Sequence, residues 1–486
     1  MYPPGIGLQE RETQGMSDPQ KINRNLRENK MLNASIPRVT LEMAIPTIIA
    51  FLINSIYSLA DTYFVSELGK SATAAVSVNS ALDQIIMMAG SMLAVGANSY
   101  VARLLGAREK EKADKVLSTA FFLALGAGTV FMIIGTAFMG PMVDLLGATD
   151  TCRQYAIEYA TYVLFAAPFM ASTFVMNQCL RAEGSAVLSM IGMGFGGILN
   201  CFLDPVFIFG WGPIPAMGVA GASIATAISK LVSFIILICP YLTRRSLLHL
   251  SWRNIHCSSD ILSQIISVGM PSMLRSGLAV VAGILLNNIA GDISDAVLAG
   301  IGVSTKIMMF PFSIILGFGS GFQPVAGFNW GARRFDRVRE SHRFASWAAL
   351  LGAGAMALVL GIFAPEVITW FNAEADPEMQ RLGALCIRLQ CIALPIHAWV
   401  AIVNMLCAGL GYAGKAFLLA TARQGTCFLP ILYPMSLLMG EIGIVSVQAV
   451  ADVLTLVLAI PILYRVRGQI QDAQTAYEAE LARQAR

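Results

Sequence analysis

The chain has 486 residues, of which 56% are hydrophobic and only 13% are charged. Because average soluble domains carry about 25% charged residues, this composition argues against a soluble enzyme. The formal net charge is +3, and the basic residues are spread over short loops. A nucleic-acid-binding protein needs a clustered basic face, so we expect no nucleic-acid partner. Apolar stretches of roughly 20 residues recur along the chain, and that length suits helices that cross a bilayer.

Residues 1–40 are polar and carry five basic residues between Lys21 and Arg38. They lack the apolar stretch of a signal peptide, and we expect a mostly disordered cytoplasmic tail with an amphipathic lead-in from about Arg27. Twelve apolar segments follow. They lie near 44–66, 80–103, 116–138, 157–180, 186–211, 216–242, 264–290, 297–324, 343–364, 381–407, 414–438 and 441–464.

Charges in the loops predict how these segments are oriented. The second, sixth and eighth loops are basic, whereas the third, seventh and ninth loops are acidic. The basic residues are Arg108, Lys110, Lys112 and Lys115 in the second loop, Arg244, Arg245 and Arg253 in the sixth, and Arg333, Arg334, Arg337 and Arg339 in the eighth. Because positive loops face the cytoplasm, we expect both termini to be cytoplasmic. We therefore expect a multi-pass protein of the cytoplasmic (inner) membrane.

The sequence also repeats itself. One fixed offset aligns Pro46 with Pro271 and Gly96 with Gly321, and a slightly longer offset continues the match further along the chain. Six spans return a chain to the same side of the membrane, so two halves of equal topology follow. Parallel repeats of this kind occur in transporters that rock two halves about a central site.

We therefore expect an all-α membrane protein with twelve transmembrane helices, in two pseudo-symmetric six-helix bundles around a central cavity. Two tails and a loop complete the expected organisation. The expected parts are a cytoplasmic N-terminal tail (1–40), an N-terminal bundle (41–243), a cytoplasmic inter-bundle loop (244–262), a C-terminal bundle (263–465) and a cytoplasmic C-terminal tail (466–486).

Two carboxylates break the symmetry of the repeat. Asp61 lies in the first apolar segment and Asp204 in the fifth, whereas the aligned positions in the second half are Leu286 and Ile431. An ionisable residue inside a transmembrane segment is costly, so it indicates a functional site by default. We expect these two acids to couple ion movement to the export of a small molecule.

Four stretches of the chain carry a family pattern. They read LADTYFV around Asp61, NQCLRAEGSA at 177–186, NCFLDPVFIF at 200–209 and GFGSGFQPVAGFNWGARRFDRVRE at 317–340. Together they resemble the multidrug and toxic compound extrusion (MATE) family, and within it the DNA-damage-inducible bacterial branch. The resemblance covers roughly residues 40–465.

The resemblance implies twelve helices in two bundles around a central cavity, and the export of drugs, often cationic, in exchange for protons or sodium. It also implies that the first helix bends at Pro46 during the cycle. In this branch it places the cation site in the N-terminal bundle. The matching residues are Asn54, Tyr57, Asp61, Asn200, Asp204 and Thr226. A glutamate in the seventh helix and an aspartate in the eighth, which other branches carry, have no match here.

The spacing of these residues supports one site. Asn54, Tyr57 and Asp61 are three and four residues apart, and so share one helix face. With about 1.5 Å of rise per residue, Asp61, Asp204 and Thr226 all lie at a similar depth in the outer half of the membrane. Two neighbouring buried carboxylates resist ionising together, so we expect at least one to hold a proton near neutral pH.

Sodium is the alternative coupling ion, and its expected ligands are Asp61, Asn200, Asp204 and Thr226. Lys230 lies one turn deeper than Thr226. It either pairs with one of the acids, which would favour proton coupling, or faces the cavity or the membrane surface.

Other polar residues of the apolar segments have two interpretations each. Gln448 and Asp452 of the last segment either contact substrate or a second coupling ion, or Asp452 forms a tie to Lys306 of the eighth segment. Arg275 and Arg388 are close enough to the segment ends to reach the membrane surface. The nine cysteines and four histidines show no metal-ligand spacing, so we expect no cofactor or metal centre beyond the coupling ion.

The leading hypothesis is a monomeric secondary active transporter that exports small amphipathic compounds, and not an enzyme. A flippase for a lipid-linked precursor, from the same superfamily, is the first alternative. An intramembrane aspartyl protease is a second, although its YD and GxGD motifs are missing.

Overall fold

The computed structural model describes residues 27–370 and 376–484, and within them the regular secondary structure is helical, apart from one isolated β-bridge between Trp211 and Ile214. A short helical stretch at 27–33 precedes the first long helix, where the amphipathic lead-in was expected. The N-terminal half contains α3 (Ile36–Ser66), α4 (Lys70–Gly106), α5 (Lys110–Ala137), α6 (Met139–Leu145), α7 (Arg153–Ala182), α8 (Ala186–Phe209) and α9 (Gly218–Leu242).

The C-terminal half follows a short 3-10 turn, η1 (Trp252–Asn254). It contains α10 (Ser259–Ile293), α11 (Asp295–Gly331), α12 (Phe335–Ile362), α13 (Ala364–Thr369), α14 (Pro377–Leu410), α15 (Ala413–Thr421), the π-helical turn η2 (Ala422–Thr426) and α16 (Phe428–Gln484).

Eleven helical stretches among the described residues are long and apolar enough to cross a membrane, and the last of them, Ala413–Gln484, holds two spans. Gly440 divides it, because its φ of 54° and ψ of −128° are not helical. The predicted eleventh and twelfth segments lie on either side of this glycine. The all-α membrane fold with twelve spans is thereby confirmed.

Both ends of the membrane region extend further as helix than the apolar segments predict. The first helix begins at Ile36 instead of residue 44. The last continues to Gln484, where polar contacts hold it against α12: Arg339 donates to Gln471 and Gln474. Hydropathy marks only the part of a helix that lies in hydrocarbon, and the tail residues beyond it, rich in Ala, Gln, Glu and Arg, are strong helix formers.

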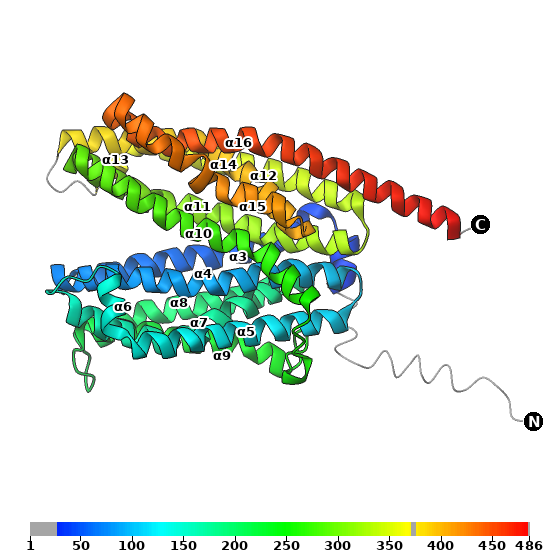
Figure 1. Ribbon diagram of the computed structural model, residues 1–486, viewed down its shortest axis with the longest axis horizontal. Helices are drawn as coiled ribbons and strands as arrows, with labels where there is room; N and C mark the ends of the chain where they lie inside the picture. The colour runs from blue at the N-terminus through cyan, green and yellow to red at the C-terminus, as the bar shows by residue number, and fades with distance from the viewer. Residues whose placement is uncertain (1–26, 371–375, 485–486) are drawn as a thin grey trace, which may run out of the picture.

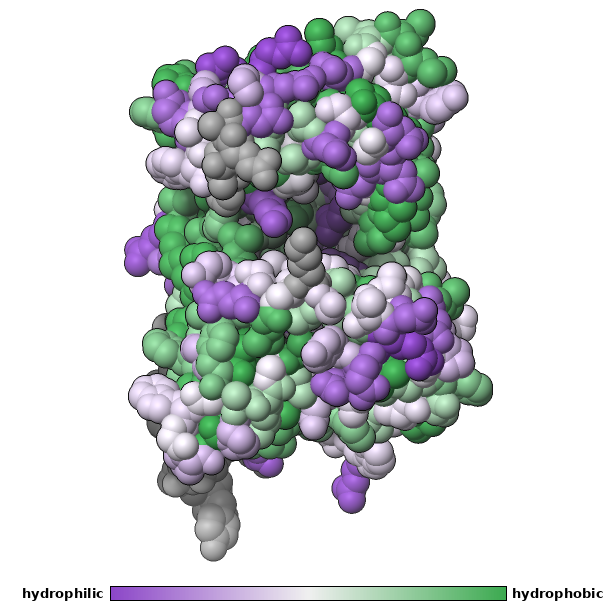
Figure 2. All heavy atoms as spheres, turned by 90° about the vertical axis from the view of Figure 1, so that its left-hand side faces the viewer, coloured by the Kyte–Doolittle hydropathy of each residue, from purple (hydrophilic) through white to green (hydrophobic). Residues whose placement is uncertain are grey.

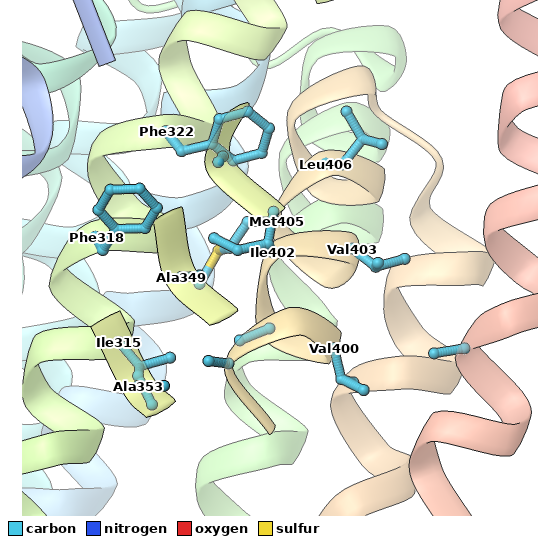
Figure 3. Packing of buried hydrophobic residues seen from close by; sticks show 14 of the residues in the cluster. Ile315, Phe318, Phe322, Ala349, Ala353, Val400, Ile402, Val403, Met405 and Leu406 are labelled. Carbon is cyan, nitrogen blue, oxygen red and sulfur yellow. The ribbon is translucent and has the colours of Figure 1, made fainter. Parts of the chain in front are cut away.

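The two halves form two layers, with α3–α9 below and α10–α16 above in Figure 1. Each half has its own apolar core. In the upper layer, Phe318 and Phe322 of α11 face Ile402 and Met405 of α14 (Figure 3). Most of each core comes from one half, and the two cores also share residues: Ala44 of α3 packs in the upper core and Ile265 of α10 in the lower.

The internal repeat is visible in the backbone. Helices α4 and α11 both end in Gly-Ala-Arg, and both arginines have a positive φ, 64° at Arg108 and 56° at Arg333. This left-handed residue closes the helix in each half. In each case the next amide donates back five residues, Glu109 to Leu104 and Arg334 to Asn329.

The same two helix ends cross each other where the halves meet. A Cβ atom at Gly106 would overlap the Phe328 carbonyl oxygen, and one at Gly331 would overlap the Arg103 carbonyl oxygen. Residues 103 and 328 are also a repeat pair, so this crossing is symmetric. Because only glycine permits such an approach of two backbones, α4 and α11 are in direct contact there.

Further bonds tie the halves together at this end. Arg103 Nη2 donates to Gln264 Oε1 of α10 at 3.1 Å, and Ser99 Oγ donates to the Ala408 carbonyl of α14. At the opposite end, Figure 2 shows a hollow between the two layers. The molecule is therefore closed at the end where α16 finishes and hollow at the other.

We predict that Gly331→Ala weakens this closure. Overpacking costs about 1–3 kcal/mol, which exceeds the gain of about 1 kcal/mol in helix propensity on replacing glycine. The thermal unfolding midpoint of the purified protein should fall. Gly126→Ala in α5 is the matched control, because nothing lies within 4 Å of its added Cβ, and it should leave the midpoint unchanged or raise it. Equal midpoints for the two variants would contradict a tight crossing.

Candidate functional site

The first candidate site lies in the N-terminal half, where α8 packs between α3 and α9. Glycines of α8 permit this packing. A Cβ atom at Gly197 would lie 3.4 Å from the Tyr57 ring of α3, and one at Gly196 would overlap the Ser233 hydroxyl of α9. Polar residues one turn further along α8 therefore meet both neighbouring helices.

Asn200 and Asp204 are such residues, and they are 1% and 0% exposed. Asn200 Nδ2 donates to Asp204 Oδ1 at 3.2 Å and to Thr226 Oγ1 of α9 at 3.3 Å. One amide thus links the carboxyl of α8 to the hydroxyl of α9. Asp204 and Thr226, which the sequence places at a similar depth, therefore share one hydrogen-bond partner.

Tyr57 and Asp61 of α3 complete this cluster. Asp61 is close enough to Asp204 for their charges to interact. Lys230 of α9 donates to the Tyr57 hydroxyl at 3.0 Å, and its Nζ lies 4.8 Å from the ring centroid. Lys230 forms no ion pair with an acid of the described chain, contrary to one expectation. It does lie close enough to Asp61 and Asp83 for their charges to interact with its own. Asn54 makes no hydrogen bond with any described residue.

A third carboxylate belongs to the cluster and was missed by the sequence argument. Asp83 of α4 is close enough to Asp61 and Lys230 for their charges to interact. The apolar segment was predicted to begin near residue 80, which made Asp83 an edge residue. The helix in fact begins at Lys70, so Asp83 lies roughly 20 Å along it. An acid two residues before a long apolar run was the available signal.

Several acceptor atoms of the cluster are buried and have no hydrogen-bond partner within the described residues. They are Asp61 Oδ1, Asp83 Oδ1, Asn200 Oδ1 and Asp204 Oδ2. A buried acceptor without a donor is costly, and a proton or a sodium ion could satisfy these atoms. Nowhere in 27–370 or 376–484 do three His, Cys, Asp or Glu side chains come close enough to hold a metal ion, so no tight cage of carboxylates is formed in this state.

The C-terminal half carries a different polar cluster. Arg423, in the π-helical turn η2, donates to Asp452 Oδ1 at 2.7 Å and Oδ2 at 3.4 Å. Gln424 donates to Gln448 at 3.4 Å. The expected tie between Asp452 and Lys306 is therefore wrong, and Lys306 is exposed. Arg423 lies in a π-helical turn, whose wider winding shifts the side-chain positions of the helix. The regular 3.6-residue periodicity of the sequence therefore does not predict which residue Arg423 contacts.

A cavity of about 180 Å³ lies between the halves. Its wall is largely apolar and includes Met87 and Met88 of α4. Amides line it as well: Gln84, Gln178, Gln323 and Asn404. Arg275 of α10, which was expected to reach the membrane surface, lines the cavity instead. The carboxylates of the first cluster do not.

Two helical layers, a cavity between them and buried ionisable side chains beside it are the architecture of a membrane transporter. The family profile described as MatE matches residues 46–206 and 271–433. The second match begins at Pro271, the residue that the repeat aligns with Pro46, so the profile matches each half once. The chain belongs to the multidrug and toxic compound extrusion (MATE) family. The protease alternative is wrong.

Individual relatives agree over almost the whole length. The chain is 27% identical over 460 residues to the multidrug export protein MepA of Staphylococcus saprophyticus, covering 92% of this chain and 97% of that protein. It is 25% identical over 439 residues to MepA of Staphylococcus haemolyticus, covering 90% and 95%. The similarity to both relatives therefore extends over about nine-tenths of this chain.

Solved structures share the fold. An outward-facing conformation of a multidrug resistance MATE family transporter has a TM-score of 0.85, 26% identity and coverage of 92% of this chain and 98% of that one. Structures of a MATE protein in a straight and a bent conformation have TM-scores of 0.85 and 0.84, with 26% and 25% identity. They cover 92% of this chain and 98% and 99% of theirs, respectively.

We predict that Arg423→Gln destabilises the protein by about 3 kcal/mol, because removing one partner leaves a buried charge uncompensated. Asp452→Asn should cost less, since the Arg423 side chain is 17% exposed whereas that of Asp452 is 4% exposed. The double variant should be more stable than the sum of the two single effects implies, by about 1–3 kcal/mol. Thermal or denaturant unfolding of all four proteins measures this coupling, and strictly additive effects would contradict the pairing.

Proposed function

We propose that this transporter is a secondary active exporter of small amphipathic compounds, which it exchanges for protons across the cytoplasmic membrane. Multidrug export is the activity named for its relatives in two Staphylococcus species, and the similarity extends over nearly the full length of the chain. The apolar, methionine-bearing wall of the central cavity supports the same substrate class, because flexible thioethers adapt to varied shapes.

The observation that carries the proposal is the set of orphaned oxygen atoms in the N-terminal half. Asp61, Asp83 and Asp204 each bury one carboxylate oxygen that accepts no hydrogen bond from the described residues. A charged carboxylate in that position would be strongly destabilised, whereas the neutral acid costs much less. The cluster is therefore suited to load and release protons as its surroundings change.

Protons are favoured over sodium by the charge at the centre of the cluster. Lys230 brings a positive charge within reach of Asp61 and Asp83, and a fixed cation repels a second one. Asn200 turns its amide nitrogen, not its oxygen, toward Asp204 and Thr226. Sodium binding at Asp61, Asn200, Asp204 and Thr226 would compete with these two hydrogen bonds.

Alternating access supplies the transport step. Because the end that carries the basic loops is closed and the opposite end is hollow, the structure corresponds to an outward-facing state if those loops face the cytoplasm. Helix α3 runs unbroken through Pro46, and proline leaves the carbonyl one turn earlier without its helical partner. Bending of α3 at this residue, accompanied by rocking of the halves, would move Tyr57 and Asp61 relative to α8.

The remaining features follow from this mechanism. The repeat places one complete path within a single chain, so a monomer suffices. The partners are small-molecule substrates and the lipid bilayer.

We predict that Asp61→Asn and Asp204→Asn each slow efflux driven by a pH gradient by at least about tenfold, since an amide cannot carry the coupled proton. The measurement is loss of a fluorescent amphipathic cation from vesicles that contain the purified protein, under an imposed pH or sodium gradient. Asp83→Asn should act in the same direction.

Asp292→Asn is the matched control, because that aspartate is exposed at the end of α10 and should support wild-type efflux. Unaltered coupling in both Asp61→Asn and Asp204→Asn would refute the proposed site. Efflux that depends on the sodium gradient and is independent of the pH gradient would identify sodium, and not the proton, as the coupling ion.

We predict that Pro46→Ala slows turnover severalfold while leaving substrate affinity within about twofold, because the new backbone N–H can bond the Glu42 carbonyl and stiffen α3. The initial efflux rate and the equilibrium binding of the same probe separate the two effects. Pro461→Ala, at an exposed position of α16, is the control and should leave both unchanged. A Pro46→Ala protein with wild-type rates would remove this residue as the hinge.

A further inference from the structure

The charges that face the central cavity are opposite in sign to those of the proton site. Arg275 is the one charged side chain among the described residues that line the cavity, and no acid lines it. The residue aligned with Arg275 in the N-terminal half is Ala50. The positive charge is thus an added feature of the C-terminal half and is not required by the shared fold.

Nothing in the described chain neutralises this charge. Arg275 forms no hydrogen bond or ion pair with any described residue. Neighbouring charges add to the positive charge of this region. Arg423 lies close enough to Arg275 for the two guanidinium groups to repel each other, and both lie close enough to His397 of α14 for their charges to interact with it. Asp452 is already held by both nitrogens of the Arg423 fork. The carboxylate of Asp452 therefore pairs with Arg423 and leaves the Arg275 guanidinium without a counterion among the described residues.

A second unsatisfied donor faces the same space. Gln323 of α11 lines the cavity and is 3% exposed, and its Nε2 is buried without a partner among the described residues. A buried donor left in this state is costly, and Arg275, which is partly exposed in the cavity, adds a positive charge without a partner among the described residues. One ligand group that is anionic and accepts hydrogen bonds would satisfy both side chains.

We propose that the central cavity binds the carboxylate of amphipathic substrates through Arg275, assisted by the Gln323 amide, so that carboxylate-bearing zwitterions are a preferred substrate class. This inference rests on the proposed export function and specifies its substrates. The planar guanidinium pairs with a carboxylate through two parallel hydrogen bonds, which fixes orientation as well as adding binding energy.

The rest of the cavity wall selects the remainder of such a molecule. Phe51, Phe174, Met88 and Leu316 present aromatic and aliphatic surface, which suits a flat apolar ring system. A single guanidinium in the wall matches one negative charge. The diphosphate of a lipid-linked sugar would need several cations, so the flippase alternative gains no support from Arg275.

A matched pair of fluorescent probes tests this inference. Rhodamine B carries a free carboxylate and a cationic ring system, and its ethyl ester keeps the ring system and loses the carboxylate. Binding of each to the purified full-length protein in lipid nanodiscs is followed by fluorescence anisotropy. We expect the wild type to bind rhodamine B about tenfold more tightly than the ester, the value of one charge-assisted contact.

Arg275→Gln should weaken rhodamine B binding about tenfold and leave ester binding within about twofold, and Arg275→Lys should retain part of the preference. Ester binding by each variant also reports that the protein is folded. Arg388→Gln is the control, since this arginine is exposed and absent from the cavity wall. If Arg275→Gln binds neither probe, Arg275→Lys becomes the test: a preference for rhodamine B that is smaller than in the wild type supports the inference, and an unchanged preference contradicts it.

Equal affinities of the wild type for the two probes, or equal losses for both in Arg275→Gln, would overturn the inference. Efflux measurements separate this from the proposed function. Proton-driven efflux of the ester without a preference for rhodamine B leaves the function standing and removes the carboxylate site. A clear preference in binding, with no efflux of either probe under a pH gradient, leaves the site and removes the exporter.

Discussion

The cost of holding charge away from water governs how this protein is organised. A membrane-embedded chain must satisfy its polar groups internally, and most of its helices do so through backbone bonds alone. Two sets of ionisable side chains stand out among the exceptions: the carboxylates between α3, α4, α8 and α9, and the guanidinium groups of α10 and η2. In both clusters some polar atoms remain unpaired within the described residues, and those atoms are where mobile partners can bind.

The two halves share a backbone and differ in chemistry. Each half ends its second long helix with the same left-handed turn, at Arg108 and at Arg333. The crossing of α4 and α11 uses equivalent glycines from both halves. Asp61, in contrast, aligns with Leu286, and Arg275 aligns with Ala50. A symmetric scaffold can rock about its centre, whereas an asymmetric set of charges gives each half a separate task. In the proposed mechanism the N-terminal half binds protons and the C-terminal half orients the substrate.

Two helices connect the clusters physically. Phe51 of α3 lines the central cavity, while Tyr57, less than two turns further on, bonds Lys230. In α4, Gln84 lines the cavity and its neighbour Asp83 belongs to the acid cluster. A bend or rotation of either helix therefore changes both environments at once. Such shared elements are what a coupling free energy between two sites requires.

The sequence by itself determined the twelve spans, the repeat and the family, and it singled out Asp61 and Asp204, which lie close together in the structure, because hydropathy, periodicity and motifs are local properties of a chain. It missed Asp83, since helix length beyond the apolar core is not encoded in hydropathy, and it misassigned the partner of Asp452. Only the tertiary structure decided that Arg423 pairs with Asp452 and that Arg275 faces the cavity. Those outcomes depend on a π-helical turn and on the packing of α10 against its neighbours, and helix rotation is set by contacts with residues far away in the chain.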